Sequence, residues 1–285
     1  MIVKKCVLCL SITVLSSFYH VPVGASEPIT TCSTTMGTDV DQYISTVYRS
    51  IDFGKGESLN PEVFNKAMHG YLNLKEAGKL NDRKQVLSVV DFTKSSNESR
   101  LWIIDLNSLK VVMHTYVAHG QGTGEEFATA FSNNFDSHQS SLGFYVTGDT
   151  YQGEHGLSLR LNGMDEGYNS AALDRGIVVH GADYVTKNFI AGNQRLGRSW
   201  GCPAVNSKLA PGIINEIKDG TCLFIYYPQS TYLKTAYWLN KKVESMPGMP
   251  SIEMLQPVSN KMIAAAMPPL KRDTIITYVP AAAHM

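Results

Sequence analysis

Apolar residues recur at helical spacing in two segments of the first third of the chain, and they predict two helices. Residues 39–49 carry the first such pattern, in which apolar side chains return every three or four positions. The second begins after Asn60, a good helix cap, with Pro61 at the first helical position and an apolar stripe up to Gly78. We expect residues 26–84 to form a helical extension that packs on the rest of the chain and has a structural role.

From Gln85 the pattern changes to short apolar runs bounded by turn residues, which is typical of strands. These runs are Val86–Phe92, Arg100–Asp105, Lys110–Ala118, Gly143–Thr147, Gly156–Leu161, Gly176–His180 and Thr221–Tyr227. Asp105–Leu109 has turn-forming residues between two runs and predicts a hairpin. A further helix is expected from about Leu209 to Lys218. The predicted fold class is mainly β, with an N-terminal helical region and a helix after Cys202.

The two ends of the chain differ in composition from this core. A short basic head is followed by an apolar run from Cys6 to Leu15 and by small residues up to Ala25, the layout of a secretory signal peptide. A run of about ten residues is too short to span a bilayer, which needs roughly twenty. We expect residues 1–25 to be removed, leaving no stable membrane anchor, and the protein to reach the periplasm or cell wall; an uncleaved anchor is the alternative. Residues 241–285, rich in Met, Pro and Ala, predict an extended or partly disordered tail.

Charge and cysteine content narrow the possible partners and chemistry. Lys and Arg together number 25, as do Asp and Glu, so nothing in the net charge favours binding to nucleic acid or anionic lipid. We expect a neutral or zwitterionic substrate. Removal of Cys6 and Cys9 with the signal would leave Cys32, Cys202 and Cys222, an odd number that leaves at least one thiol unpaired.

The segment from Arg175 to Asn206 carries most of the candidate chemistry. An apolar strand ends in His180-Gly181, which places an imidazole beside a residue with no side chain, where a substrate backbone can approach. Gly201 precedes Cys202, and main-chain N–H groups there can point at a developing oxyanion. A nearby imidazolium shifts a thiol toward the thiolate. The pattern favours Cys202 as a nucleophile with His180 as its base.

At these residues the sequence resembles the L,D-transpeptidase (YkuD-type) catalytic domain, and more closely its murein-associated branch. The matching residues are His180-Gly181, then Ser199-Trp200-Gly201-Cys202 after a loop, with Ser141–Val146 upstream similar to the family's Pro-x-Gly strand. The resemblance covers about residues 85–228, within a catalytic domain predicted at residues 85–240. Trp200 replaces the histidine usual before Gly-Cys, and Pro203-Ala204 replaces a pair that ends in Arg or Asn.

The resemblance implies a β-sandwich-like catalytic domain whose histidine is oriented by a main-chain carbonyl. It implies an exported cysteine acyltransferase, in which the thiolate attacks the bond between the third and fourth residues of a peptidoglycan stem peptide. The terminal D-amino acid leaves, and an amine takes the acyl group. No metal or organic cofactor is expected.

Several alternatives stay open. On the same scaffold, the chain can be an L,D-carboxypeptidase, in which water takes the acyl group, or a non-catalytic cell-wall-binding module. A zinc site at His180 and Cys202 needs a third donor, and no CxxC or HxxxH spacing supplies one. Cys202 can instead pair with Cys222 in a disulfide, although Cys222 lies in an apolar run and is expected to be a buried small hydrophobe.

Other residues of the segment are candidate substrate contacts. Arg195 and Arg198 have a geometry suited to bidentate binding of a substrate carboxylate; a solvated loop face is the equal alternative. Trp200 is expected to wall the pocket, and Asp183 or Tyr184 to orient His180 or bind the substrate amine. The predicted substrate-binding residues are Ser199, Trp200, Arg198, Arg195, Tyr184 and Gly181.

The remaining histidines are weaker candidates. His138 lies in a loop and is a candidate for the same cleft, whereas His155, next to a turn, is expected at the surface. His114 and His119 are five residues apart on a predicted strand and fall on opposite faces, so they make a poor metal pair.

Overall fold

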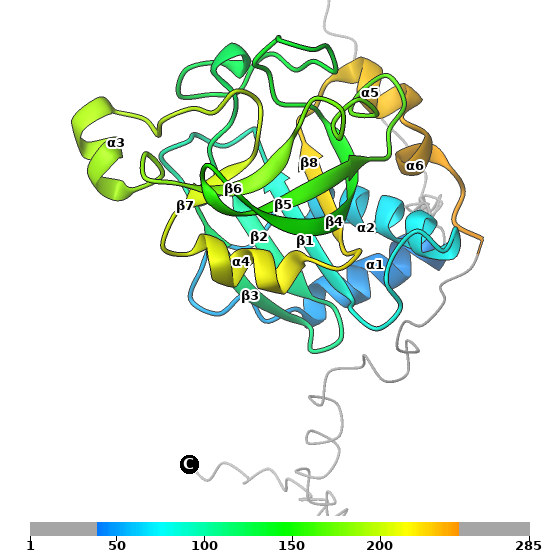
Figure 1. Ribbon diagram of the computed structural model, residues 1–285. Helices are drawn as coiled ribbons and strands as arrows, with labels where there is room; N and C mark the ends of the chain where they lie inside the picture. The colour runs from blue at the N-terminus through cyan, green and yellow to red at the C-terminus, as the bar shows by residue number, and fades with distance from the viewer. Residues whose placement is uncertain (1–38, 245–285) are drawn as a thin grey trace, which may run out of the picture. The chain divides into compact units, whose positions relative to one another are not determined.

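A computed structural model describes residues 39–244, which build a mixed β-sheet with helices packed on it (Figure 1). Within these residues eight strands follow the order β3-β2-β1-β8-β4-β5-β6-β7. The strands are β1 Val86–Asp91, β2 Leu101–Asp105, β3 Lys110–Thr115, β4 Gly143–Gly153, β5 Gly156–Gly163, β6 Val178–Ala182, β7 Ala204–Asn206 and β8 Cys222–Tyr226. The helices are α1 Asp39–Ser50, α2 Pro61–Glu76, 3-10 helix η1 Gln121–Thr123, α3 Lys187–Asn193, α4 Ala210–Ile217, α5 Ser230–Thr235 and α6 Tyr237–Asn240. The predicted fold class is confirmed.

The sheet joins two groups of strands through β8. Strands β1, β2 and β3 form an antiparallel meander, which confirms the hairpin predicted at Asp105–Leu109. Strand β8 lies between the two groups, parallel to β1 and antiparallel to β4. Beyond β4, strands β5 and β6 continue antiparallel, and β7 pairs with β6 in parallel. Figure 1 shows that the long strands β4 and β5 curve strongly.

The two predicted N-terminal helices are confirmed, and the start of α2 has the predicted cap. Asn60 Oδ1 accepts the N–H groups of Glu62 and Val63 at 2.8 and 3.4 Å. Helix α2 approaches β4 closely, because a Cβ on Gly70 would lie 2.0 Å from the ring of Phe144. Both helices contribute to the buried core that the strands form. The domain limits at residues 84 and 240 stay predictions.

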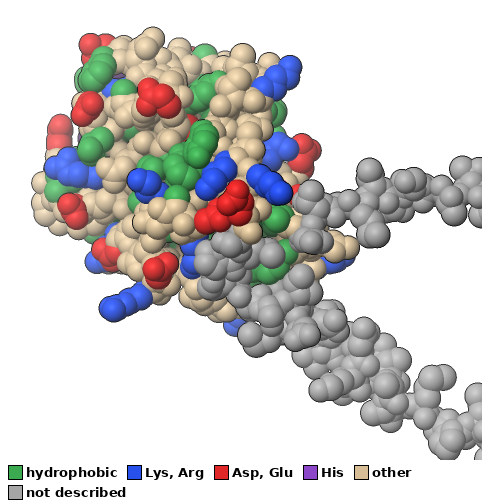
Figure 2. Space-filling view, turned by 90° about the vertical axis from the view of Figure 1, so that its right-hand side faces the viewer, with side chains coloured by type: hydrophobic (Ala, Val, Ile, Leu, Met, Phe, Trp, Pro, Cys, Tyr) green, Lys and Arg blue, Asp and Glu red, His purple; other side chains and the backbone are tan. Residues whose placement is uncertain are grey.

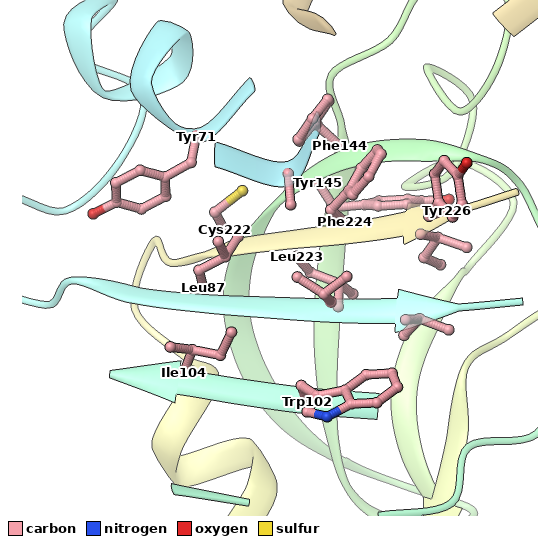
Figure 3. Close-up of a cluster of buried hydrophobic side chains, with 14 of the residues drawn as sticks. Tyr71, Leu87, Trp102, Ile104, Phe144, Tyr145, Cys222, Leu223, Phe224 and Tyr226 are labelled. Atoms are coloured by element: carbon pink, nitrogen blue, oxygen red, sulfur yellow. The ribbon is translucent and has the colours of Figure 1, made fainter. Parts of the chain in front are cut away.

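Aromatic and aliphatic side chains from α2 and the central strands fill the core (Figure 3). Phe144 of β4 stacks on Phe224 of β8 with ring centroids 4.2 Å apart. Cys222 on β8 is fully buried in the same cluster, as predicted for a small apolar side chain. Burial of such surface is the main stabilising contribution to a fold of this kind.

The elements that the sequence pattern failed to predict are short or polar. Strand β7 has three residues, and α3 begins at a polar segment capped by Thr186, whose Oγ1 accepts the Phe189 N–H at 3.1 Å. Strand β4 extends past the predicted end at Thr147 to Gly153, where pairing with β5 rather than apolar alternation holds it. Hydrogen bonding to a neighbouring strand can therefore form a strand where the local sequence is uninformative.

Basic and acidic side chains are interspersed on the face seen in Figure 2. Over residues 39–244, no helix is both long and apolar enough to cross a membrane. The predicted signal peptide at residues 1–25, Cys32 and the predicted tail from residue 245 onward lie outside the described residues.

Candidate active site

Strands β6 and β7 bring His180 and Cys202 to the same end of the sheet. The strands pair in parallel with His180 opposite Ala204, so Cys202, just before β7, comes beside the start of β6. The Val178 N–H points at Cys202 Sγ, with 3.5 Å from nitrogen to sulfur. The thiol lies 3.8 Å from the Gly176 carbonyl oxygen. The connection between the two strands thus returns the cysteine to the strand that carries the histidine.

A serine motif shapes the turn that holds Cys202. Ser199 Oγ accepts the Gly201 N–H at 3.1 Å and donates to the Cys202 carbonyl at 2.6 Å. Gly201 has φ of +118°, and a Cβ there would lie 2.7 Å from the Gln139 carbonyl oxygen, so the position requires glycine. The Ser140 hydroxyl donates to the Gly201 carbonyl at 3.1 Å from the other side. The Ser-x-Gly-Cys sequence is therefore a fixed turn that presents the thiol.

The hydrogen bond of His180 determines which ring nitrogen is free. Nδ1 lies 3.0 Å from the Gly181 carbonyl oxygen, and a carbonyl only accepts, so Nδ1 carries the proton of the neutral ring and Nε2 keeps a lone pair. Burial lowers the pKa of His180; the Gly181 carbonyl partly opposes this, and the charge of His155 adds to it. His180 is 4% exposed. These effects favour a neutral base at pH 7.

The electrostatics of Cys202 also favour its neutral form. Burial raises the pKa of the thiol, and the Val178 N–H and the Arg175 guanidinium partly oppose the shift. Burial lowers the pKa of His180 at the same time, so it disfavours the charged form of both residues. Removal from water penalises both charged forms, which opposes the predicted shift toward a thiolate beside an imidazolium; that pairing stays a prediction.

A cavity of about 530 Å³ opens over the pair. Its wall consists of Tyr151, Gly153, Glu154, His155, Ser158, Arg175, Gly176, Ile177, Val178, His180, Tyr184, Arg198, Ser199, Trp200 and Cys202. Cavities of this size accommodate small molecules. The structure brings six of the predicted site residues to this wall: Cys202, His180, Ser199, Trp200, Arg198 and Tyr184.

Three predicted site residues lie outside the wall. The Gly201 N–H is bound to Ser199 Oγ, so this group does not point into the cavity as a free donor. Gly181 packs against α4, since a Cβ on it would lie 3.0 Å from Ser207 Cα and 3.1 Å from Ala210 Cβ. The Cβ side of Gly181 is therefore filled by these residues, and its carbonyl holds His180 Nδ1; the predicted substrate contact at Gly181 stays a prediction. The third residue, Arg195, forms an ion pair with Glu125.

The two predicted carboxylate-binding arginines hold a carboxylate of the chain itself. Arg195 Nε and Arg198 Nη1 lie 2.9 and 2.7 Å from the two oxygens of Glu125. Arg198 also donates to the Gly124 carbonyl at 3.0 Å. The two guanidinium groups do bind a carboxylate, but it is that of Glu125 in the same chain.

Asp183 and Tyr184 separate in the structure. Asp183 accepts the Ser207 hydroxyl at 2.5 Å, so its carboxylate is engaged near α4. Tyr184 lines the cavity and packs its ring against Gly197, where a Cβ would lie 2.4 Å from the ring. Burial raises the pKa of Tyr184 to about 12, which keeps its hydroxyl protonated and able to donate.

The β4–β5 hairpin forms a wall of the cavity that sequence analysis missed. It contributes Tyr151, Glu154 and His155. His155 is exposed, as expected, but its ring stacks on His180 with centroids 4.5 Å apart and planes 24° apart. The hairpin is polar and precedes the motif in the chain, so only the curvature of β4 and β5 places it over the site.

Trp200 and Arg175 lie between this cavity and a smaller one. Trp200 is 70% exposed and stacks on His138, with centroids 4.9 Å apart. The second cavity, of about 160 Å³, is lined by Phe135, Asp136, His138, Arg175, Ile177 and Trp200. Trp200 walls both spaces, and His138 lines the second one. Sequence analysis did not single out Arg175, because its position depends on loops distant in sequence.

The alternative readings of the cysteines and histidines receive little support. Cys202 and Cys222 are both free thiols, so no disulfide joins them. In the described part of the chain, no three His, Cys, Asp or Glu side chains form a possible metal site. His119 is buried, and its Nδ1 lies 2.8 Å from Nη2 of the buried Arg100, while His114 Nε2 bonds to the Ser99 carbonyl.

Comparison with known proteins gives a family match and distant structural neighbours. Residues 55–226 match the family model of the L,D-transpeptidase catalytic domain, whereas the curated proteins contain no match. Similar solved structures include an L,D-transpeptidase from Mycobacterium smegmatis, at 12% identity and TM-score 0.32, over 50% of this chain and 59% of that one. Another is L,D-transpeptidase LdtMt1 in complex with imipenem, at 10% identity and TM-score 0.31, over 50% and 58%.

A third similar structure is the L,D-transpeptidase from Xylanimonas cellulosilytica, at 14% identity and TM-score 0.30, over 67% of this chain and 94% of that one. The chain thus spans less than two thirds of the first two proteins.

Proposed function

The chain belongs to the L,D-transpeptidase catalytic domain family, and on that premise we propose that it is a cysteine acyltransferase acting on peptidoglycan stem peptides. Cys202 is the nucleophile and His180 its base. The observation that carries the proposal is the bond from His180 Nδ1 to the Gly181 carbonyl. It leaves Nε2 as a proton acceptor in the cavity that also exposes Cys202.

Acylation follows from this arrangement. Cys202 Sγ attacks the carbonyl carbon between the third and fourth residues of the stem peptide, while His180 Nε2 takes the thiol proton. The tetrahedral intermediate then collapses, the C–N bond breaks, and the imidazolium gives the proton to the departing amine. The products are a thioester on Cys202 and a free terminal D-amino acid.

Deacylation reverses the proton movements with a second nucleophile. An acceptor amine loses a proton to His180 and attacks the thioester, and the thiol leaves with the proton returned to sulfur. Water in place of the amine gives an L,D-carboxypeptidase, the alternative on this scaffold. The turn fixed by Ser199 and Gly201 supports both outcomes, because it keeps the thiol in place through both steps.

The remaining walls of the cavity support substrate positioning. Trp200 offers an exposed ring at the mouth, and Tyr184 keeps a protonated hydroxyl inside it. Peptidoglycan lies outside the inner membrane, so this substrate requires export. The secretory signal at residues 1–25 and a periplasmic or cell-wall location are therefore part of the proposal.

The proposal is tested by incubating the purified protein with disaccharide-tetrapeptide, with and without a second peptide bearing a free amine. Mass spectrometry should detect loss of the terminal D-alanine, followed by a cross-linked product if the amine takes the acyl group, or a tripeptide if water does. The Cys202→Ala variant should yield neither product. A folded wild-type protein that leaves the tetrapeptide intact would favour a non-catalytic wall-binding module.

A further inference from the structure

Arg175 is held by oxygen atoms that carry no charge. Its Nη1 donates to the Ser132 carbonyl at 2.9 Å and to the Ser141 hydroxyl at 2.5 Å. Its Nη2 donates to the Ser137 hydroxyl at 3.2 Å and to the Gln139 carbonyl at 2.8 Å. These contacts fix the guanidinium plane while leaving its positive charge unpaired.

This setting differs from that of the other arginine in the wall. Arg198 forms an ion pair with Glu125, whereas the ion pairs among residues 39–244 include none to Arg175. A half-buried cation without a counter-ion is costly. A bound anion would offset that cost, so the charge is available to a ligand.

Arg175 lies in the walls of both cavities, one of which also contains Cys202. The next residue, Gly176, supplies the carbonyl contacted by Cys202 Sγ. The Arg175 charge also opposes the rise in the pKa of Cys202. The four described hydrogen bonds use the Nη hydrogens, which leaves the Nε–H as a donor for an anion.

A stem peptide bound for cleavage carries an anion close to the scissile bond. The residue released is the last one, so its α-carboxylate lies one residue beyond the carbonyl that Cys202 attacks. One residue spans at most about 3.3–3.6 Å of chain. A cation beside the thiol can therefore detect whether the peptide ends there.

We propose that Arg175 binds the terminal carboxylate of the D-amino acid that leaves, and thereby restricts cleavage to peptides that end one residue after the scissile bond. This inference rests on the proposed function, since it concerns the substrate of the same site. A peptide with a C-terminal amide has the same bonds to break but no charge at that position. The free acid is thus the preferred substrate.

The first test compares two substrates of the wild-type protein, disaccharide-tetrapeptide as the free acid and as its C-terminal amide. A charge-assisted hydrogen bond to a half-buried cation predicts kcat/KM for the acid about 10- to 100-fold higher than for the amide. Equal turnover of acid and amide would overturn the proposal for Arg175 alone. Absence of turnover with either substrate would instead contradict the proposed function, and this inference with it.

Variants then assign the preference to a residue. Arg175→Gln should bring the ratio of acid to amide close to one, and Arg175→Lys should keep part of it because the charge remains. Arg198→Gln, the matched control in the same wall, should keep the ratio. If Arg175→Gln slows the reaction of both substrates equally, the cause is the loss of a charge that acts on the thiol. Only the acid-to-amide ratio of kcat/KM therefore measures binding of the carboxylate.

The remaining outcomes also decide the proposal. A preference for the free acid over the amide that persists in Arg175→Gln would overturn the proposal. Loss of that preference in Arg198→Gln alone would also overturn it. If Arg175→Gln fails to fold because the loop of residues 132–141 loses its anchor, Arg175→Lys decides. Retention of part of the preference in Arg175→Lys supports charge recognition at this position, and an unchanged ratio contradicts any dependence on the guanidinium.

Discussion

The two cysteines of the described chain differ in what surrounds them. Cys222 lies on β8 with its sulfur toward Tyr71 of α2, inside the core (Figure 3). Cys202 lies in a turn before β7, at the wall of a cavity that also contains His180. Burial raises the pKa of both thiols. A shifted pKa therefore does not distinguish the two thiols, whereas access to a cavity and a histidine in the same wall do.

Replacing each cysteine by alanine gives the largest contrast. We expect Cys202→Ala to abolish turnover of disaccharide-tetrapeptide, because it removes the nucleophile. Cys222→Ala should keep the turnover and lower the free energy of unfolding by about 1 kcal/mol, roughly the value of one buried methylene group. Steady-state assays and urea denaturation measure the two effects. Loss of activity in a folded Cys222→Ala variant would contradict the distinction.

Replacing His180, the proposed base, should have the next largest effect on activity. His180→Gln keeps a donor for the Gly181 carbonyl but has no basic nitrogen, so kcat/KM should fall about 10²- to 10⁴-fold. His69→Gln on α2, where Nε2 lies 3.0 Å from Asp41, is the control far from the cavity. Activity near the wild-type value in His180→Gln would show that another group accepts the thiol proton.

The turn before Cys202 predicts a combined effect on stability and activity. Gly201→Ala places a Cβ 2.7 Å from the Gln139 carbonyl oxygen at φ of +118°, which costs about 1–3 kcal/mol. Since the thiol moves with the turn, kcat/KM should also fall. Gly212→Ala is the matched control, because it lies in α4 with no atom within 4 Å of the added Cβ. That control should be neutral or slightly stabilising.

The smallest predicted effect concerns the pH dependence of the reaction. The lowered pKa of His180 keeps the base unprotonated to lower pH, so the acid limb of kcat/KM should lie below the ordinary histidine value of about 6.5. His155→Ala removes the ring that stacks on His180 and also its charge. Both changes should raise the pKa of His180, so the acid limb of kcat/KM should shift to higher pH by less than about one unit. His155→Phe, which keeps the stacked ring, should move it less. Identical profiles for all three proteins would exclude an influence of His155 on the base.

Local sequence signals predicted the elements that carry strong periodicity or caps. The Asn60–Pro61 start of α2 and the apolar runs of β1, β2 and β8 are examples, because their structure depends on nearby residues. Strand β7 was missed because three residues carry no period. Its pairing with β6 is what places Cys202 beside the start of that strand.

The site was predictable where chemistry is confined to the motif, and not where it depends on distant chain segments. His180, Cys202 and Ser199 share one stretch of sequence, and they do meet at one cavity. Arg175 is held in place by hydrogen bonds to residues 132–141, and His155 reaches the ring of His180 through the curvature of a hairpin. Glu125 forms ion pairs with Arg195 and Arg198, the two arginines predicted to bind a substrate carboxylate. The local sequence around these arginines does not indicate this partner, because Glu125 lies about 70 residues away in the chain.

The most direct test of the central claim is the intact mass of the protein after brief exposure to a carbapenem, and separately to disaccharide-tetrapeptide. The account predicts a single acyl adduct on the wild-type protein and on Cys222→Ala, and none on Cys202→Ala. An adduct that persists in Cys202→Ala, or a folded wild-type protein that remains unmodified by both reagents, would contradict Cys202 as the acylated nucleophile.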